Sequence, residues 1–168
     1  MCVFIDEKGT SSVSSIFDYN TPIGRIRIED NGEAVTSVTF VEGDERIPVN
    51  RNESPLIREA FCQLDEYFKG KRKSFDLPLF PKGTNFQRRV WQALLKIPYG
   101  TVCSYKDIAE EVGNCKAYRA VGGASGKNPI PIIIPCHRVV GNKGNLVGYE
   151  GGLEIKRFLL ELESKAKI

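Results

Sequence analysis

Residues 104–125, SYKDIAEEVGNCKAYRAVGGAS, decide the fold of the second half of this chain. Ser104 is a favoured helix N-cap, and the apolar residues that follow it recur at helical spacing as far as Val112. Gly113 and Asn114 then indicate a tight turn, and we expect a second helix from about residue 116 to residue 125. Two short helices joined by a turn that contains glycine match the helix-turn-helix outline.

The second of these helices has an unusual composition, because small residues surround a single arginine, Arg119. A helix that reads the DNA major groove normally carries several long polar side chains. A helix of small residues instead allows close backbone approach, which suits a narrow minor groove with Arg119 entering the base stack as a wedge. The alternative is an internal helix packed tightly through its glycines, with Arg119 in a surface ion pair. The segment alone leaves both interpretations open.

Apolar residues at helical spacing indicate three further helices. Ser54 and Pro55 open the first, which ends at Gly70. Thr84 can cap the second, which continues to about Lys96. The third is expected over residues 153–163. Its apolar side chains are Leu153, Ile155, Phe158, Leu159 and Leu162.

The first half of the chain has strand patterns. Residues 14–40 read as a β-meander, with a turn at residues 22–24 and a tight-turn signal at Asn31-Gly32. A meander followed by a helix, and then by several helices, predicts an α+β fold.

Polar and proline-rich segments divide the chain. Residues 1–12 read as a polar, mobile segment, residues 43–52 as a polar loop and residues 77–83 as a linker. We place the domain boundary near residue 82. This gives an N-terminal domain of residues 1–82 and a mostly helical C-terminal domain of residues 83–168.

Composition limits the class of protein. Apolar residues make up 41% and charged residues 27% of the 168 residues, which is ordinary for a globular protein. No apolar run approaches the roughly 20 residues that span a bilayer. The N-terminus lacks the pattern of a signal peptide, so we expect an intracellular protein. The net charge of +3 is compatible with binding to nucleic acid and does not identify it.

The five cysteines suggest neither a disulfide framework nor a zinc site. Their number is odd and their spacing is irregular. The chain also has no Cys-x-x-Cys and only one histidine. We therefore expect no metal.

Pro135-Cys136-His137-Arg138 holds that histidine, directly after a cysteine. A free thiol has a pKa of about 8.5 and needs a base or a positive charge to become a nucleophile at neutral pH. Residues 132–134 read as a buried strand that ends at the proline, which places the thiol at a strand end. Along an extended strand the ring of His137 cannot easily reach Cys136, so a bridging water or a bend is needed.

Two interpretations of Cys136 stay open at this point, a nucleophile and a small buried core residue. A triad needs a carboxylate behind the imidazole, and spacing does not select Glu163 from the 21 acidic residues. Asn128, which precedes Pro129, is either a catalytic residue or the start of a simple turn.

Taken together, these segments resemble the O6-alkylguanine-DNA alkyltransferase family. The Pro-Cys-His-Arg-Val sequence at residues 135–139 is the signature of that family. The resemblance covers about residues 83–163 and extends weakly to residues 66–70. It implies a small ribonuclease-H-like N-terminal domain and a winged-helix-like C-terminal domain with a helix-turn-helix. The other matching blocks are residues 86–91, 97–100, 104–105, 119–124, 128–131, 148–149 and 151–153.

The resemblance implies DNA repair by direct reversal. The alkyl group of O6-alkylguanine, and of O4-alkylthymine, would move irreversibly to Cys136 after base flipping through the minor groove. His137 would be the base, acting through a water and oriented by Glu163. Asn128 would brace the active-site turn, and Tyr105 would contact the guanine and help to supply its proton. No metal or diffusible cofactor is implied, and each molecule would act once.

The resemblance also implies partners and contact residues. The partner is double-stranded DNA that contains O6-alkylguanine. We expect a monomer, no membrane association, and a location in the cytoplasm, or in the nucleus of a eukaryote. The implied DNA-binding residues are Ser104, Lys106, Asn114, Ala117, Arg119, Ala120 and Gly122, and the implied substrate-pocket residues are Ser125, Val139, Tyr149 and Glu150.

The chain departs from the family pattern at several positions. Cys115 stands where many members have proline, and Tyr118 where many have alanine, which puts the groove contacts of Tyr118 in doubt. Ser125 and Glu150 fall at pocket-rim positions that vary in the family.

Three other functions are disfavoured by the sequence. A lesion-binding relative without activity lacks the signature cysteine. A helix-turn-helix regulator would carry base-reading side chains in its second helix. A thiol hydrolase needs an oxyanion hole, which nothing in the sequence indicates.

Overall fold

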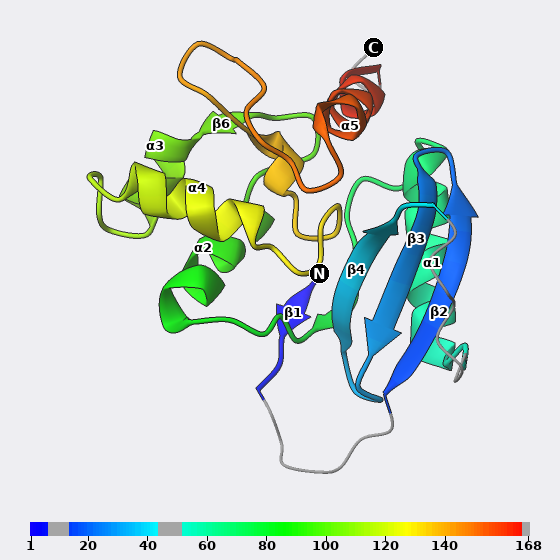
Figure 1. Cartoon of the computed structure of the whole chain (residues 1–168). Helices are drawn as coiled ribbons and strands as arrows, with labels where there is room; N and C mark the ends of the chain where they lie inside the picture. Colours follow the sequence, from blue (N-terminus) through cyan, green and yellow to red (C-terminus); the bar gives the residue numbers. More distant parts are fainter. Residues whose placement is uncertain (7–13, 44–51, 166–168) are drawn as a thin grey trace. The chain divides into compact units, whose positions relative to one another are not determined.

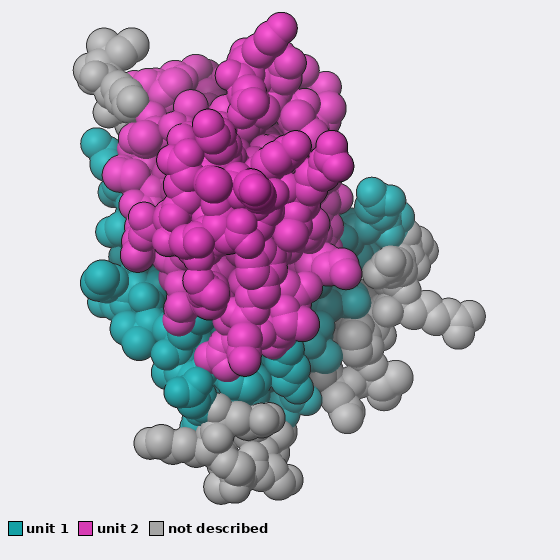
Figure 2. Space-filling model, turned by 90° about the vertical axis from the view of Figure 1, so that its left-hand side faces the viewer, with its two compact units in different colours: residues 1–82 teal, residues 83–168 magenta. Residues whose placement is uncertain are grey.

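The computed structural model describes residues 1–6, 14–43 and 52–165 (Figure 1). The chain divides into two compact units, Met1–Lys82 and Gly83–Ile168 (Figure 2). No helix in the described part of the chain is long and apolar enough to cross a membrane.

The first unit contains a five-stranded sheet (Figure 1). Three strands form the expected meander, with antiparallel pairing between neighbours, and this prediction is confirmed. The strand order in the sheet is β1-β5-β4-β3-β2. The strands are β1 (Val3–Phe4), β2 (Ser15–Thr21), β3 (Gly24–Asp30), β4 (Val35–Val41) and β5 (Pro78–Leu79).

One helix, α1 (Pro55–Phe68), packs against the meander. It begins where the sequence predicts, because the Oγ of Ser54 accepts a hydrogen bond from the Ile57 N–H at 3.0 Å. In β3 the side chains alternate, and Ile26 and Ile28 are fully buried. The core of this unit therefore lies between one face of the sheet and the apolar face of α1.

Two expectations for the first unit are wrong. Val3–Phe4 and Pro78–Leu79 are paired strands and not parts of a mobile segment and a linker. Strands of two residues are too short to show alternation, so nothing in the sequence marks them. The ladder between β1 and β5 uses the carbonyls of Leu77 and Leu79, so the proline at position 78 removes no donor from it. The rest of the mobile segment, residues 7–12, and most of the polar loop, residues 44–51, lie outside the described residues.

The second unit is mostly helical, as predicted. A short 3₁₀ turn and a two-stranded parallel sheet complete it. The predicted helix after residue 116 begins slightly later, at Tyr118, because residues 115–117 still belong to the turn. The elements are α2 (Asn85–Leu95), β6 (Cys103–Ser104), α3 (Tyr105–Glu111), α4 (Tyr118–Gly126), η1 (Cys136–Arg138), β7 (Val139–Val140) and α5 (Leu153–Lys165).

Local capping explains where these helices start. Thr84 with Gln87, and Ser104 with Asp107, form capping boxes at the starts of α2 and α3. The buried Trp91 donates its indole N–H to the carbonyl of Ala124 at 2.9 Å, which ties α2 to α4. The two helices of the helix-turn-helix, α3 and α4, are thus held on a third helix.

The strand expected over residues 132–134 does not form. Ile132 has a left-handed backbone with φ of 72°, and the Ile134 N–H donates to the Ile130 carbonyl at 2.9 Å. The run is buried, as predicted, but it is a tight turn. A short run of apolar residues has no period that distinguishes a strand from a compact turn.

Of the apolar residues expected to line the buried face of α5, only Leu159 is fully buried. Leu153 and Phe158 are exposed, whereas Lys156, Leu159 and Glu163 are fully buried. The buried face of the last helix therefore carries one cation and one anion.

Candidate active site

Cys136 is the first residue of the 3₁₀ turn η1, and only 8% of its surface is exposed. The side-chain amide of Asn128 donates to the Cys136 Sγ at 3.2 Å and to the Ile134 carbonyl at 2.8 Å. The same side chain accepts a hydrogen bond from the Ile130 N–H at 3.0 Å. Asn128 therefore spans the turn that ends at the thiol.

This turn holds a strained residue. A left-handed conformation costs a β-branched residue such as Ile132 about 1–3 kcal/mol. The strain persists because the side chains around it are buried and because Asn128 fixes both ends of the turn. The sequence thus places a rigid loop immediately before the thiol.

The next two residues of η1, His137 and Arg138, both contact Glu163 of α5. His137 Nε2 lies 2.7 Å from Glu163 Oε1. The guanidinium of Arg138 donates to both oxygens of the same carboxylate, each at 3.0 Å. The Gly100 N–H also donates to Glu163 Oε2, at 2.8 Å. A 3₁₀ turn, and not the expected strand end, brings both side chains onto one carboxylate.

These contacts determine the charge states of Glu163 and His137. Burial alone would raise the pKa of Glu163, but hydrogen bonds from His137 and Arg138 outweigh it and lower that pKa to about 2. Burial lowers the pKa of His137 below 6.5, so its imidazole is neutral at neutral pH. A neutral ring that donates from Nε2 to the carboxylate has its lone pair on Nδ1.

The thiol itself is protonated at rest. Burial raises the pKa of Cys136 to about 11, although the Asn128 hydrogen bond and the charge of Lys156 lower it. A base must therefore remove the proton when the thiol reacts.

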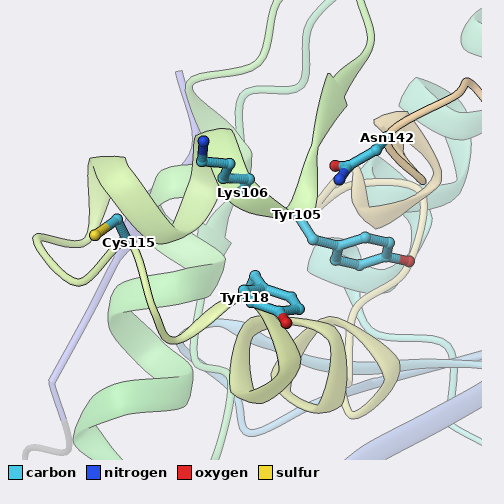
Figure 3. A pocket seen from close by; sticks show the side chains of 5 residues that line it. All are labelled: Tyr105, Lys106, Cys115, Tyr118 and Asn142. Carbon is cyan, nitrogen blue, oxygen red and sulfur yellow. The ribbon is translucent and has the colours of Figure 1, made fainter.

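A hollow of about 450 Å³ opens between the starts of α3 and α4 (Figure 3). Tyr105 and Lys106 of α3, Tyr118 of α4, Cys115 and Asn142 line it. Tyr105 is close enough to Cys136 for a charge on the thiol to raise its pKa, after the larger effect of burial. Its hydroxyl lies 3.5 Å from the Val147 carbonyl. Tyr105 thus connects the hollow to the thiol.

The outer face of α4 is open. Arg119 is exposed and is not paired with an acidic side chain among the described residues; its Cζ lies 5.8 Å from the centre of the Tyr118 ring. A methyl group added at Gly123 or Gly126 would meet nothing within 4 Å. The internal helix, packed through its glycines with Arg119 in an ion pair, is therefore wrong. Side chains of α4 that do pack inward include Val121 and Ala124.

The other expected DNA-binding residues differ in how exposed they are. Ala120 is exposed, Ala117 is half-buried, and Gly122 lies beside the Tyr105 ring. Lys106 and Asn114 are also exposed, whereas the Ser104 hydroxyl is engaged in the cap of α3.

None of the residues expected to form the substrate pocket lines the hollow. Val139 and Ser125 are buried, and the Ser125 hydroxyl has no hydrogen-bond partner within the described part of the chain. Tyr149 is half-buried and Glu150 is exposed. The charge of Glu150 nevertheless reaches the thiol and raises its pKa.

Sequence reasoning missed three residues of this region. Arg138 completes the network around Glu163, Lys156 lies buried near the thiol, and Asn142 lines the hollow. A possible signal was the spacing of Lys156, Leu159 and Glu163, which places two charged residues on the same helical face as a core leucine. No group of three or more His, Cys, Asp or Glu side chains among the described residues is placed to hold a metal ion.

Comparison with known proteins gives consistent matches over both units. Residues 85–165 match the family described as 6-O-methylguanine DNA methyltransferase, DNA binding domain. Residues 18–81 match the ribonuclease-like domain of the same family.

Individual relatives match over most of their length. A Methanosarcina barkeri protein named methylated-DNA–protein-cysteine methyltransferase is 50% identical over 146 residues, which is 85% of this chain and 92% of the relative. The constitutive Bacillus subtilis protein of the same name is 47% identical over 150 residues, with 85% and 91% covered. The crystal structure of the Mycobacterium tuberculosis O6-methylguanine methyltransferase has a TM-score of 0.83 at 42% identity, and the match covers 92% of this chain and 94% of that one. A structure of M. tuberculosis OGT in complex with DNA has the same TM-score at 43% identity, with 90% and 94% covered.

The network around Glu163 predicts an acid-sensitive stability. Its folded pKa of about 2 lies below the unfolded value of about 4.3. Its contribution is therefore present above about pH 4 and is lost as the pH falls towards 2. Glu163→Gln leaves the buried Arg138 charge without its carboxylate and should lower the free energy of unfolding at pH 7 by about 3–5 kcal/mol. Denaturant unfolding over a pH series measures both effects.

Glu161→Gln is the matched control, because Glu161 is exposed on the same helix. Its free energy of unfolding should stay within about 0.5 kcal/mol of the wild type. Equal stability of Glu163→Gln and wild type at neutral pH would contradict the importance of the network.

Proposed function

This chain belongs to the 6-O-methylguanine DNA methyltransferase family, and we propose that it repairs DNA by moving an alkyl group from O6 of guanine to Cys136. The observation that carries the proposal is the buried thiol beside a neutral histidine that a carboxylate orients. Relatives named methylated-DNA–protein-cysteine methyltransferase support it at about half identity.

The reaction balances without a cofactor. The Cys136 thiol loses its proton, and the sulfur electron pair forms an S–C bond to the alkyl carbon. The O6–C bond breaks, its electron pair stays on the guanine, and the base takes up one proton to become ordinary guanine. The protein keeps a thioether, which has no easy leaving group, so each molecule reacts once.

His137 receives the thiol proton in this proposal. Its imidazole is neutral near pH 7 and donates from Nε2 to Glu163, so Nδ1 is the basic atom. A water would carry the proton from Cys136 to the ring. Glu163 fixes the orientation of the ring and stabilises the imidazolium that forms, as the carboxylate does in other triads.

Asn128 and Tyr105 act on either side of the thiol. Asn128 holds the sulfur by a hydrogen bond that stabilises the thiolate. Burial raises the pKa of Tyr105, which keeps the phenol protonated. It can therefore donate the proton that the departing guanine needs. Val139 and the backbone around Cys136 would hold the base edge, with Tyr149 and Glu150 at the sides of the pocket.

The open face of α4 would bind the minor groove of double-stranded DNA. Small residues there permit close approach of the backbone, and Arg119 would take the place of the flipped base. We propose that the protein acts as a monomer on duplex DNA that contains O6-alkylguanine, with O4-alkylthymine as a second substrate.

Intact-protein mass tests the proposed transfer. Duplex DNA with one O6-methylguanine should add a single methyl group to wild-type protein, on the peptide that contains Cys136. Cys136→Ala should gain nothing. Cys62→Ser changes an exposed cysteine on α1 and should react like the wild type. Repair of the DNA without any gain of protein mass, or methylation of another cysteine, would overturn the proposal.

The role of Arg119 predicts a substrate-dependent loss. Extruding a base costs a few kcal/mol, so Arg119→Ala should slow the reaction with duplex DNA on the order of tenfold to a hundredfold. Its reaction with free O6-benzylguanine should be unchanged, because no base must be extruded. The rate constants of both reactions are measured in single-turnover experiments.

Lys127→Ala is the control for loss of one positive charge near the end of the same helix, where Lys127 is exposed. It should affect duplex DNA only slightly. If Arg119→Ala slows the reactions with duplex DNA and with free O6-benzylguanine equally, the proposed role of Arg119 in base extrusion is wrong.

A further inference from the structure

Lys156 of α5 is a fully buried cation that the mechanism above does not use. Its Nζ donates to the Val139 carbonyl at 2.7 Å and to the Val147 carbonyl at 2.9 Å. Within the described part of the chain, no carboxylate is paired with it. Burying an ammonium group against neutral carbonyls is costly in free energy, and a methionine of similar length would avoid that cost. The buried charge of Lys156 is therefore better explained by a function than by stability.

One of the two carbonyls follows the thiol closely in the sequence, and the other meets Tyr105. Val139 begins β7, three residues after Cys136, and Val147 belongs to the loop between β7 and α5. The Val147 carbonyl also lies within 3.5 Å of the Tyr105 hydroxyl. One ammonium group thus connects α5, β7 and the loop that meets Tyr105.

The charge of Lys156 also reaches the thiol directly. Among the groups that shift the pKa of Cys136, Lys156 lowers it and Glu150 raises it. In return, the thiolate raises the pKa of Lys156, which burial has lowered. The two groups stabilise each other's charged forms.

Other ionisable groups around Cys136 do not replace this cation. Tyr105 of α3 and His137 of η1 are neutral near pH 7. Arg138 is bound to the carboxylate of Glu163, so the positive and negative charges of this pair cancel. Lys156 is the cation left to balance a thiolate.

We propose that Lys156 is a positioning residue for alkyl transfer, whose buried ammonium group holds the carbonyls of Val139 and Val147 and stabilises the Cys136 thiolate. This inference rests on the proposed alkyl transfer. In it, Lys156 contacts neither substrate nor the reacting carbon. It lowers the free energy of the thiolate that His137 generates and holds the Val147 carbonyl that the Tyr105 hydroxyl also meets.

The test uses the full-length protein with two substitutions. Lys156→Met keeps the length of the side chain and removes its charge, and Lys156→Arg keeps the charge. Lys165→Met removes a charge from an exposed position on the same helix and is the matched control. For each protein, the rate of Cys136 alkylation by iodoacetamide is measured against pH, with the modified cysteine identified by peptide mass.

Removal of the cation should raise the thiol pKa. At about pH 7–8, where Lys156 carries its charge, Lys156→Met should therefore react roughly tenfold more slowly than the wild type, which corresponds to about one unit of thiol pKa. Lys156→Arg should react at least as fast as the wild type at that pH, because a guanidinium keeps the positive charge. Lys165→Met should match the wild type. Binding of duplex DNA should be unchanged in all three.

Two results would overturn the inference. One is a folded Lys156→Met protein that reacts at about pH 7–8 as fast as the wild type, because Lys156 would then contribute only to stability. If Lys156→Met does not fold, the Lys156→Arg variant is used instead. A rate at about pH 7–8 well below that of the wild type, despite the retained charge, would be the second such result. Iodoacetamide requires no DNA, so this outcome is separate from that of the proposed function, which fails only if wild-type protein gains no methyl group from alkylated duplex DNA.

Discussion

The carboxylate of Glu163 joins three segments of the second unit that lie far apart in the sequence. It accepts hydrogen bonds from Gly100 before β6, and from His137 and Arg138 in η1, while itself belonging to the last helix. A buried carboxylate is tolerated only when charge and hydrogen bonds replace its hydration, and here both are supplied. Because η1 also begins with Cys136, this anion fixes the segment that carries the thiol, and Asn128 fixes the turn before it.

Burial gives the thiol properties that suit a reagent used once. The pKa of about 11 keeps Cys136 protonated and protected until a base acts. An enzyme with many turnovers must release its product from the active site. A protein that keeps the alkyl group as a thioether needs an active site only for the step that forms the S–C bond. The hollow beside Tyr105 lies at the start of α4, and the outer face of that helix is open (Figure 3). The departure at Tyr118 adds an aromatic wall to that hollow and a stacking partner for Arg119.

The helices could be predicted from the sequence, because their starts are capped by residues such as Ser54, Thr84 and Ser104. The segment before Cys136 could not, since its buried isoleucines carry no period and the left-handed backbone at Ile132 has no sequence signal. Adjacency and family resemblance pointed to His137 and Glu163, and the structure brings them together. Lys156 was missed because a lysine is expected to be exposed, and only the packing of α5 shows that it is buried.

The claim that the chain's single histidine is a neutral base oriented by Glu163 can be measured directly. Nitrogen NMR of protein labelled at histidine gives one imidazole, because His137 is the only histidine. We predict that the ring titrates below its usual pKa of about 6.5, and that the proton of its neutral form is on Nε2. A ring that titrates at or above its usual value, or that carries its neutral-form proton on Nδ1, would contradict the buried base on which the proposed chemistry depends.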